Sequence, residues 1–436
     1  MIETLRRRIS GLPFFYGWVV VGIAFVTMAI GVTSRTAYSL FMPPLIDEFG
    51  WDRGLTAGAF SFGFLFSAVL GPITGRLMDR YGPRVVIEIG VAIMGSGLLL
   101  APFIHTPWQL YATLGVMVGG GSNLMSYTAQ SLYLPNWFAR KRGLAISVAF
   151  AGAGVGAIAL LPLLQTVIEG EGWRAACWLL GILALVVLGP LNLMVWRRPA
   201  NLGLLPDGDR EGGQGSAKRG LHIVDEAWAA VDWTVSRALR TGRFWWLALA
   251  YFCGLFAWYP VQVHQTKYLQ EVGFSPLLAA WALGMVAVVG IPGQISFGAL
   301  SDRIGREWVW SIGCVGFIVC YVCLIFLEHA PSPTLLYLMV FSQGFLGYAL
   351  TSVMGPVVAE IFEGRHYGSI FGVLTVILTS GGAAGPWAAG LIHDLTGSYY
   401  WAFVLTIGCC FVSIGAIWIA GPRKVRVVPG RAPRLA

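Results

Sequence analysis

Long apolar segments recur along the whole chain, and they restrict its fold more than any other feature. A helix needs about 20 consecutive apolar residues to cross the hydrocarbon core of a bilayer. Of the 436 residues, 56% are hydrophobic and only 11% are charged, whereas soluble domains carry about 25% charged residues. Little of the sequence remains for a domain in water. These segments therefore predict an all-α integral membrane protein.

The apolar segments predict twelve transmembrane helices in two halves of six. Connections are short except at residues 197–243, which are Gly-rich and charged. This composition is typical of a solvated linker, here with a short amphipathic helix near residues 225–240 on the membrane surface. The predicted domains are an N-terminal half (1–196), a cytoplasmic linker (197–243) and a C-terminal half with a cytoplasmic tail (244–436). The predicted spans are residues 15–42, 54–78, 84–103, 108–134, 143–167, 173–196, 244–269, 276–300, 308–327, 334–360, 367–391 and 399–420.

A short charged motif occurs once in each half. Residues 75–84 (GRLMDRYGPR) follow the second span, and residues 298–306 (GALSDRIGR) follow the eighth. Two similar halves imply a pseudo-twofold axis along the membrane normal, with a binding site between the halves. The motif aspartates can pair with arginines and with helix N-termini, which would hold cytoplasmic helix ends together. The predicted gating residues are Asp79, Arg80, Arg84, Asp302, Arg303 and Arg306.

The basic residues predict the orientation of the chain in the membrane. If the N-terminus is cytoplasmic, only Arg53, Arg174 and Lys267 of the basic residues fall toward the opposite side, and Arg35 lies within a span. Basic loops stay in the cytoplasm. We therefore expect a multi-pass plasma (inner) membrane protein with both termini in the cytoplasm. The formal net charge of +8 then reflects topology, and not nucleic-acid binding.

Arg35 lies deep within the first predicted span. A charge at such depth is costly and is seldom retained without a function. Among the acidic residues, only Glu88 and Glu360 fall within predicted spans, and both lie near cytoplasmic ends. Arg35 is therefore a candidate for binding the negative charge of a substrate. The alternatives are that it extends to an interface or neutralises an acidic side chain.

His264 in the seventh span is the candidate for proton coupling, because an imidazole changes charge near physiological pH. The alternative is a neutral histidine that is hydrogen-bonded between helices. Asn123 and Tyr127 are four residues apart and are expected to share one helix face, and Tyr348 corresponds to Asn123 in the second half. Each such polar residue alone more often joins helices than binds a ligand. The predicted substrate-binding residues are Arg35, Tyr38, Asn123, Tyr127, His264, Gln294 and Tyr348.

Other motifs give no support to enzyme chemistry. The Gly-rich residues 152–156 and 381–386 follow no predicted strand, so they indicate close helix packing and not phosphate binding. The CxxC of Cys320 and Cys323 has no second metal-binding pair beside it. No nucleophile or metal-ligand set accompanies His393-Asp394. We therefore expect no enzyme activity, no cofactor and no metal.

The repeated motif in a chain of six plus six spans resembles the major facilitator superfamily, over essentially all the sequence outside residues 197–243. A narrower resemblance is carried by residues 16–20 (YGWVV) and 137–145 (WFARKRGLA), which are similar to the monocarboxylate transporter and oxalate–formate exchanger branch. In the proton-linked members a lysine follows the Gly-Trp start of span one, and Arg35 matches its position. The resemblance implies that Arg35 binds a carboxylate.

The sequence departs from this branch at two other cationic positions. Both relatives place an arginine in span eight, where register with Asp302 gives Gln294 here. The exchanger also has a lysine in span eleven, where this chain has Leu374. A clamp for a dicarboxylate is therefore missing. A monoanion, or a larger weakly acidic molecule, fits this pattern better than oxalate.

The expected function is secondary active transport of a small organic anion, in particular a monocarboxylate. Transport would proceed by proton symport or exchange through alternating access. The expected partners are the anion, a proton or counter-substrate, and the lipid bilayer. The alternative is an exporter of larger hydrophobic or aromatic compounds, which the many aromatic residues and the single deep cation also permit.

Overall fold

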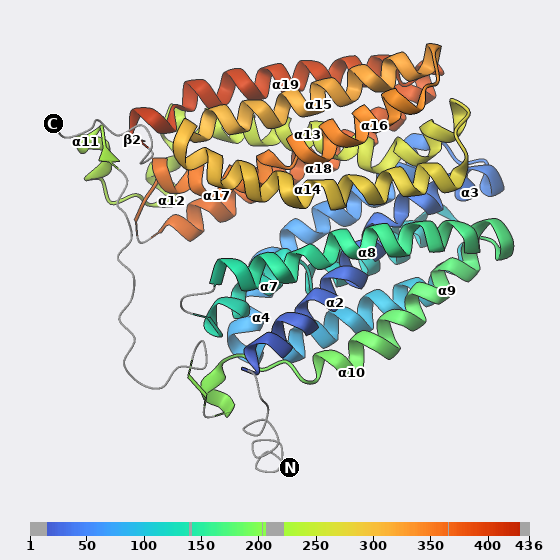
Figure 1. Cartoon of the computed structure of the whole chain (residues 1–436), viewed down its shortest axis with the longest axis horizontal. Helices are drawn as coiled ribbons and strands as arrows, with labels where there is room; N and C mark the ends of the chain where they lie inside the picture. The colour runs from blue at the N-terminus through green and yellow to red at the C-terminus, as the bar shows by residue number, and fades with distance from the viewer. Residues whose placement is uncertain (1–14, 139–141, 203, 206–221, 365, 428–436) are drawn as a thin grey trace. The chain divides into compact units, whose positions relative to one another are not determined.

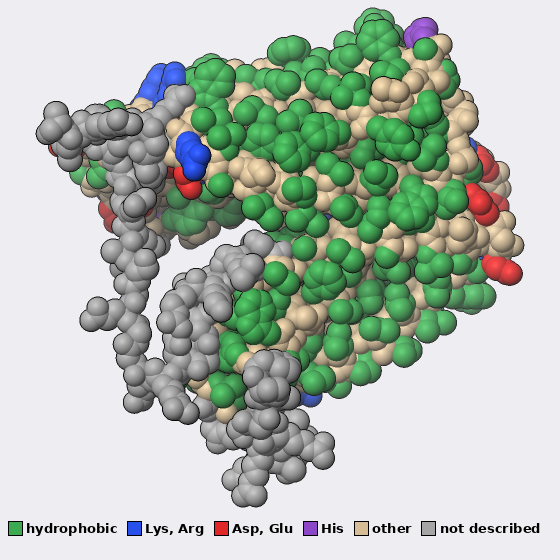
Figure 2. Space-filling view, viewed as in Figure 1, with side chains coloured by type: hydrophobic (Ala, Val, Ile, Leu, Met, Phe, Trp, Pro, Cys, Tyr) green, Lys and Arg blue, Asp and Glu red, His purple; other side chains and the backbone are tan. Residues whose placement is uncertain are grey.

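The computed structural model describes residues 15–138, 142–202, 204–205, 222–364 and 366–427 (Figure 1). They are predominantly helical, and they contain eleven helical segments that are long and apolar enough to cross a membrane. Hydrophobic side chains cover the middle of these helices on the face shown in Figure 2, while charged side chains gather at their ends. This is the pattern expected of a protein surrounded by lipid. The expectation of an all-α membrane protein is confirmed.

The described residues fall into two compact units, which divide the chain differently from the predicted halves. The first unit comprises the described parts of Met1–Tyr38 and Val69–Lys218, and the second those of Ser39–Ala68 and Arg219–Ala436. Residues 39–68 join the second unit because they are hydrogen-bonded and ion-paired to its helices, as detailed below. Helix α4 (Arg53–Leu100) contributes to both units, and it is kinked at Gly82, which has a non-helical backbone (φ 81°).

Each unit consists of long helices joined by short helical segments. Besides part of α4, the first unit contains α2 (Gly17–Thr36), η1 (Ala101–Phe103), α5 (Pro107–Leu110), η2 (Tyr111–Val118), α6 (Gly119–Asn123), α7 (Tyr127–Tyr133), η3 (Leu134–Asn136), α8 (Arg142–Glu171), α9 (Trp173–Leu183), η4 (Ala184–Leu188), α10 (Gly189–Asn192) and η5 (Pro199–Leu202). The second contains most of α3 (Tyr38–Phe49), then β1 (His222–Ile223), α11 (Glu226–Ala229), α12 (Val235–Leu239), α13 (Gly242–Glu271), α14 (Pro276–Ile304), α15 (Arg306–His329), α16 (Pro333–Phe341), η7 (Ser342–Leu346), α17 (Ala349–Ile361), α18 (Tyr367–Thr396), α19 (Tyr400–Ala420), η8 (Pro422–Lys424) and β2 (Arg426–Val427).

The fourth predicted span, residues 108–134, is not one continuous helix. It consists of α5, the π-helix η2, α6 and α7, so no piece reaches the length of the other spans. Residues 119–121 are three consecutive glycines, and Ser126 has an extended backbone (φ −81°, ψ −168°). Glycine weakens a helix interior, and a π-helix interrupts the regular α-helical hydrogen bonds. The apolar composition predicted the segment, but composition alone did not show these interruptions.

Glycine positions allow the principal helix pairs to pack closely. In the first unit, a Cβ at Gly152 or Gly156 of α8 would overlap the backbone of Phe25 or Ala29 in α2. In the second unit, a Cβ at Gly381 of α18 would overlap the carbonyl of Phe252 in α13. Such small-residue contacts are how membrane helices bring their backbones together. The close packing predicted from both Gly-rich stretches is confirmed.

A tyrosine hydroxyl interrupts α13 beside Pro260. The hydroxyl of Tyr321 in α15 accepts a hydrogen bond from the backbone N–H of Val261 over 3.3 Å and donates one to the carbonyl of Ala257 over 2.6 Å. Proline removes a backbone donor and bends a helix. The inserted hydroxyl satisfies polar backbone atoms beside the proline, and α13 continues to Glu271.

Residues 222–243 of the predicted linker fold onto the second unit. Strand β1 pairs antiparallel with β2 of the C-terminal segment, with His222 opposite Val427. Two short helices, α11 and α12, replace the single amphipathic helix that was expected. Trp233 between them is only 5% exposed and belongs to the hydrophobic core of the unit. This part of the linker is therefore packed against protein, although its composition predicted a solvated segment.

The glycine contacts generate a stability prediction. Gly381→Ala should lower the free energy of unfolding by about 1–3 kcal/mol, because the added methyl group forces α18 away from α13. Gly408→Ala in α19 is the matched control, since nothing lies within 4 Å of a Cβ at that position. The thermal unfolding temperatures of the purified variants in one detergent measure the difference. Equal unfolding temperatures would contradict the packing argument.

Candidate functional site

Arg35 lies in the last turn of α2, and the helix ends one residue later at Thr36. The next helix, α3, begins at Tyr38. The residue between the two helices, Ala37, keeps a helical backbone (φ −59°, ψ −14°), and Gly17–Phe49 forms one apolar segment. The side chain of Arg35 is half-buried, whereas Tyr38 is buried at 4% exposure. The fold thus keeps Arg35 within the first span.

Asn123 and Tyr348 lie at corresponding helix breaks in the two units. In the first unit, α6 ends at Asn123 and a turn leads to α7. In the second unit, the π-helix η7 ends at Leu346 and Tyr348 precedes α17. Broken membrane helices expose backbone groups that can bind polar substrates and ions. The correspondence inferred from the repeat therefore coincides with a shared backbone irregularity.

The expectation that Asn123 and Tyr127 share one helix face is wrong. The turn and the extended backbone at Ser126 separate α6 from α7, so spacing by four residues no longer sets their directions. The ring of Tyr127 packs edge-on against Phe150 of α8, with centroids 4.9 Å apart. The substrate-binding role of both residues stays a prediction.

Tyr348 and Gln294 lie near each other in the second unit. The ring of Tyr348 packs against Gly290 of α14, and Gln294 follows Gly290 by one helical turn. The ring of Tyr348 also packs against Trp258 of α13, and the two ring centroids lie 4.7 Å apart. Gln294 is half-buried. These residues combine an aromatic wall with an amide that can donate and accept hydrogen bonds.

His264 lies apart from Tyr348 and Gln294 and is hydrogen-bonded between helices. It is 2% exposed. Its Nε2 lies 2.9 Å from the carbonyl oxygen of Pro386 in α18, and its Nδ1 lies 2.8 Å from the hydroxyl of Tyr399. This geometry matches the interhelical alternative that the sequence left open. A role in proton coupling stays a prediction.

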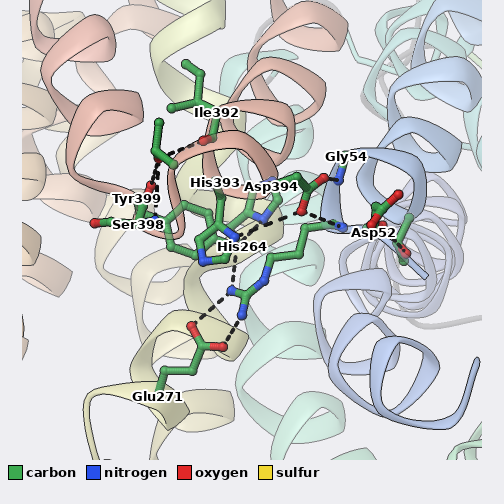
Figure 3. A network of polar contacts seen from close by, with 12 residues as sticks. Asp52, Gly54, His264, Glu271, Ile392, His393, Asp394, Ser398 and Tyr399 are labelled. Atoms are coloured by element: carbon green, nitrogen blue, oxygen red, sulfur yellow. Dashed lines mark hydrogen bonds and ion pairs between the residues drawn. The ribbon is translucent and has the colours of Figure 1, made fainter. Parts of the chain in front are cut away.

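A polar cluster that sequence reasoning did not assemble surrounds Tyr399 (Figure 3). Arg53 at the start of α4 binds Glu271 at the end of α13 with both terminal nitrogens, and the Nη1–Oε2 distance is 2.9 Å. Nη1 also donates to the hydroxyl of Tyr399 over 3.1 Å. Bidentate pairing of a guanidinium with a carboxylate is the strongest common geometry for such a pair. We call Arg53, His264, Glu271, Asp394 and Tyr399 the Arg53 cluster.

Asp394 of α18 ties the first turn of α4 to the Arg53 cluster. Its carboxylate accepts hydrogen bonds from the backbone N–H of Arg53 over 3.0 Å and of Gly54 over 2.6 Å. A carboxylate at a helix N-terminus satisfies free N–H groups and interacts favourably with the helix dipole. Because Gly390 approaches the backbone of Gly54, α18 and α4 lie in direct contact here. Asp394 therefore has a structural use, which also accounts for the His393-Asp394 pair.

Two further contacts hold α3 to α13. Lys267 pairs with Asp47 at 2.7 Å, and the hydroxyl of Ser39 lies 2.6 Å from that of Thr266. The partners in these contacts are more than 200 residues apart in sequence. The sequence showed opposite charges at the ends of predicted spans, which indicated that ion pairs form there. It did not show which charges pair with each other.

The second copy of the charged motif forms an ion-pair network. Arg306 pairs with Asp302 at 2.6 Å and with Glu360 of α17 at 2.8 Å. Glu360 is 2% exposed, whereas Arg303 is exposed. The motif glycine Gly305 has φ 102°, a conformation that glycine adopts readily. Arg306 thus joins α15 to the end of α17 and offsets the charge of Glu360.

The first copy of the motif is described in less detail. Gly82 has φ 81°, which matches the turn conformation at Gly305. Arg80 and Arg84 are exposed, and the guanidinium of Arg80 lies 5.2 Å from the ring centroid of Tyr81. The side chain of Asp79 lies outside the described residues. The gating roles predicted for both copies stay predictions.

The C-terminal segment adds contacts that the sequence did not reveal. Arg426 donates to the carbonyl of Glu360 over 2.7 Å and pairs with Glu363 at 3.1 Å. The backbone N–H of Arg423 donates to Glu307 over 2.9 Å. These contacts fix the segment against the same helix ends that Arg306 joins. Among the described residues, no group of three or more His, Cys, Asp or Glu side chains could hold a metal ion.

Comparisons with known proteins agree with this fold. Residues 23–353 and 265–435 match the family model described as Major Facilitator Superfamily. Monocarboxylate transporter 13 from Rattus norvegicus is 26% identical, over 95% of this chain and 89% of its own length. Monocarboxylate transporter 1 from Homo sapiens is also 26% identical, over 92% of this chain and 85% of its length. A solved bacterial homologue of the human lysosomal transporter Spinster superimposes with a TM-score of 0.70 at 18% identity, covering 96% of this chain and 100% of that one.

The motif network generates a second stability prediction. Arg306→Ala should destabilise the protein by about 3–5 kcal/mol, because it leaves the buried Glu360 without its ion partner. Arg303→Ala is the matched control within the same motif, since Arg303 is exposed. Thermal unfolding in detergent measures both. If the two variants unfold at the same temperature, Arg306 does not offset a buried charge.

Proposed function

Because this chain belongs to the major facilitator superfamily, and is therefore a multi-pass membrane transporter and not an enzyme, we propose that it transports a small organic anion. The favoured substrate is a monocarboxylate. It moves by proton symport or by exchange, through alternating access of the site to the two sides of the membrane. Both termini lie in the cytoplasm and the membrane is the plasma (inner) membrane, as the distribution of basic residues indicates.

The position of Arg35 is the observation that carries this proposal. It places a permanent positive charge within the first span, at the end of α2. The acidic residues of the predicted spans, Glu88 and Glu360, lie toward the cytoplasmic ends of those spans. A site with this balance attracts anions and repels cations. Arg35 binds the carboxylate of the substrate with charge-assisted hydrogen bonds.

The relatives and the remaining residues narrow the substrate class. Relatives at 26% identity are named monocarboxylate transporters, which supports a substrate with one carboxylate. Gln294 stands where the related branch has a second cation, so a dicarboxylate would leave one charge uncompensated. Asn123 and Tyr348, at the helix breaks, contribute neutral hydrogen-bonding groups and backbone groups for the rest of the molecule. Tyr38, Tyr127 and Gln294 complete the proposed site.

Two sets of contacts serve as gates in this mechanism. Asp302, Arg303 and Arg306 form the inner gate of the second half, and Asp79, Arg80 and Arg84 form that of the first. The Arg53 cluster lies at the opposite end of α13 from its start at Gly242, which is the outer end in the proposed orientation. Closing either gate excludes water from one side of the site.

Removal of the Arg35 charge is the direct test. Arg35→Ala should reduce the uptake of a labelled monocarboxylate into proteoliposomes by about 10- to 100-fold, the effect of losing a charged hydrogen bond. Arg35→Lys keeps the charge and should retain part of the activity. Arg240→Ala, an exposed linker position, is the control for the loss of a basic residue. Normal uptake by Arg35→Ala in correctly inserted protein would refute the proposed role.

A second candidate function is export of larger hydrophobic or aromatic compounds. The observation that favours it is the aromatic wall at Tyr348 and Trp258, because aromatic rings stack on such surfaces. Competition in proteoliposomes separates the two candidates. Short aliphatic monocarboxylates should inhibit uptake if the first proposal holds, whereas only bulky aromatic compounds should inhibit it if the second does.

A further inference from the structure

We propose that the Arg53 cluster is a proton-controlled outer gate, in which a proton on His264 reverses the hydrogen bond to Tyr399 and weakens the Arg53–Glu271 pair. This inference rests on the proposed function for the orientation of the chain and for alternating access. It goes beyond that function because it identifies which contact the proton breaks. The argument follows from the directions of four hydrogen bonds.

The hydrogen-bond partners of His264 fix its neutral form. The carbonyl oxygen of Pro386 can only accept, so Nε2 must carry a hydrogen and donate it over 2.9 Å. In a neutral imidazole Nδ1 then has no hydrogen, and it accepts the hydroxyl hydrogen of Tyr399 over 2.8 Å. Burial raises the pKa of Tyr399, so this hydroxyl keeps its hydrogen at physiological pH. The neutral histidine therefore satisfies every polar atom in the contact.

Tyr399 connects His264 to the ion pair. Its hydroxyl oxygen accepts a hydrogen bond from Nη1 of Arg53 over 3.1 Å while donating to His264. The same Nη1 also donates to Glu271 over 2.9 Å. Hydrogen bonds therefore run in one direction, from Arg53 through Tyr399 and His264 to the carbonyl of Pro386. The hydroxyl of Tyr399 can donate to His264 only while Nδ1 of His264 accepts.

A proton on His264 is incompatible with this arrangement. Both ring nitrogens of an imidazolium donate, so Nδ1 would direct its hydrogen at the hydroxyl oxygen that already accepts from Arg53. The hydroxyl hydrogen of Tyr399 would have to turn toward another acceptor, and the carboxylate of Glu271 competes for it. Two cations would also face one buried hydroxyl, and like charges in a buried site repel. The proton therefore disfavours the closed contact between Arg53 and Glu271.

The contact that weakens is the one that joins α4 to α13. Arg53 is the first residue of α4 and Glu271 is the last residue of α13. The hydrogen bonds that Asp394 accepts from the backbone N–H groups of Arg53 and Gly54 join α4 to α18 instead, and they involve no histidine nitrogen. Protonation of His264 thus weakens one of the contacts at this end of α13, while the α4–α18 contact and the contacts of α3 with Thr266 and Lys267 remain. Outer acid then favours the state in which the outer gate is open.

A second histidine provides the matched control. His393 of α18 is half-buried, and its ring centroid lies 4.5 Å from that of Tyr399, but its Nδ1 lies nearest to Asp394, at 3.9 Å. It lies outside the relay of hydrogen bonds from Arg53 to Pro386. The charged and titratable groups around His264 and its partners are Asp47 in α3, Arg53 in α4, Lys267, Tyr268 and Glu271 in α13, Tyr321 and Glu328 in α15, His393 and Asp394 in α18, and Tyr399 before α19.

The test measures access to a cysteine placed about two helical turns after Arg53 in α4. Ser61 in α4 is 6% exposed and its hydroxyl has no hydrogen-bond partner among the described residues, so Ser61→Cys is a conservative change. A charged, membrane-impermeant methanethiosulfonate reagent is applied to full-length protein in proteoliposomes, without substrate, between about pH 7.5 and about pH 5.5. Rates are divided by those of His105→Cys, an exposed position in the first unit. The protein without an introduced cysteine keeps its native cysteines and gives the background labelling rate.

The proposal predicts that the normalised labelling rate rises as the pH falls, by up to about tenfold per pH unit for a single linked proton. His264→Asn keeps an acceptor for Tyr399 but cannot be protonated in this range, so its labelling should stay slow at both pH values. His393→Asn should keep the pH dependence of the parent. Arg53→Gln should label rapidly at both pH values.

Three results would overturn the proposal: labelling that does not depend on pH, pH dependence that persists in His264→Asn, or pH dependence that is lost in His393→Asn. If His264→Asn does not fold, Tyr399→Phe replaces it, because it removes the hydroxyl that links His264 to Arg53 and keeps the ring. That variant should also lose the pH dependence. No substrate is present in this test. The labelling result can therefore refute the proposed gate while the uptake assay with Arg35→Ala still supports the proposed transport function.

Discussion

Within hydrocarbon, a polar group that lacks a partner costs several kcal/mol, and this constraint accounts for the principal buried polar contacts among the described residues. Glu360 is tolerated because Arg306 lies against it. His264 is buried because both of its ring nitrogens are hydrogen-bonded. Arg53 and Glu271 meet as a bidentate pair at the ends of two helices. In the proposed mechanism, the pairs at the two gates are also the contacts that break when the transporter changes conformation.

The general architecture follows from local sequence. Apolar segments predict the long helices, since length and hydropathy act on each segment separately. The Gly-rich stretches predict close helix pairs because glycine lacks a Cβ, and Gly152 and Gly381 do lie against neighbouring backbones. The continuous helix expected at residues 108–134 was wrong. A π-helix and the extended backbone at Ser126 depend on local hydrogen bonds that an average of hydropathy does not register.

The site was less predictable than the fold because its contacts join distant parts of the chain. Arg53 and Glu271 are 218 residues apart, and Arg53 and Asp394 are 341 apart. The sequence placed each of these charges near the end of a span, but it could not show which ones meet. The packed part of the linker was missed for the same reason. Trp233 is surrounded by polar residues in sequence and by core residues in space.

The hydroxyl of Tyr321 that enters α13 beside Pro260 has a mechanical consequence. The helix there is held by bonds to a side chain, which can lengthen or rotate without leaving a backbone group bare in lipid. In the proposed mechanism, the C-terminal third of α13, with His264 and Glu271, pivots while the rest of the helix stays packed. The hydroxyl of Tyr321 thus sets the position of this pivot along the helix, between Ala257 and Val261.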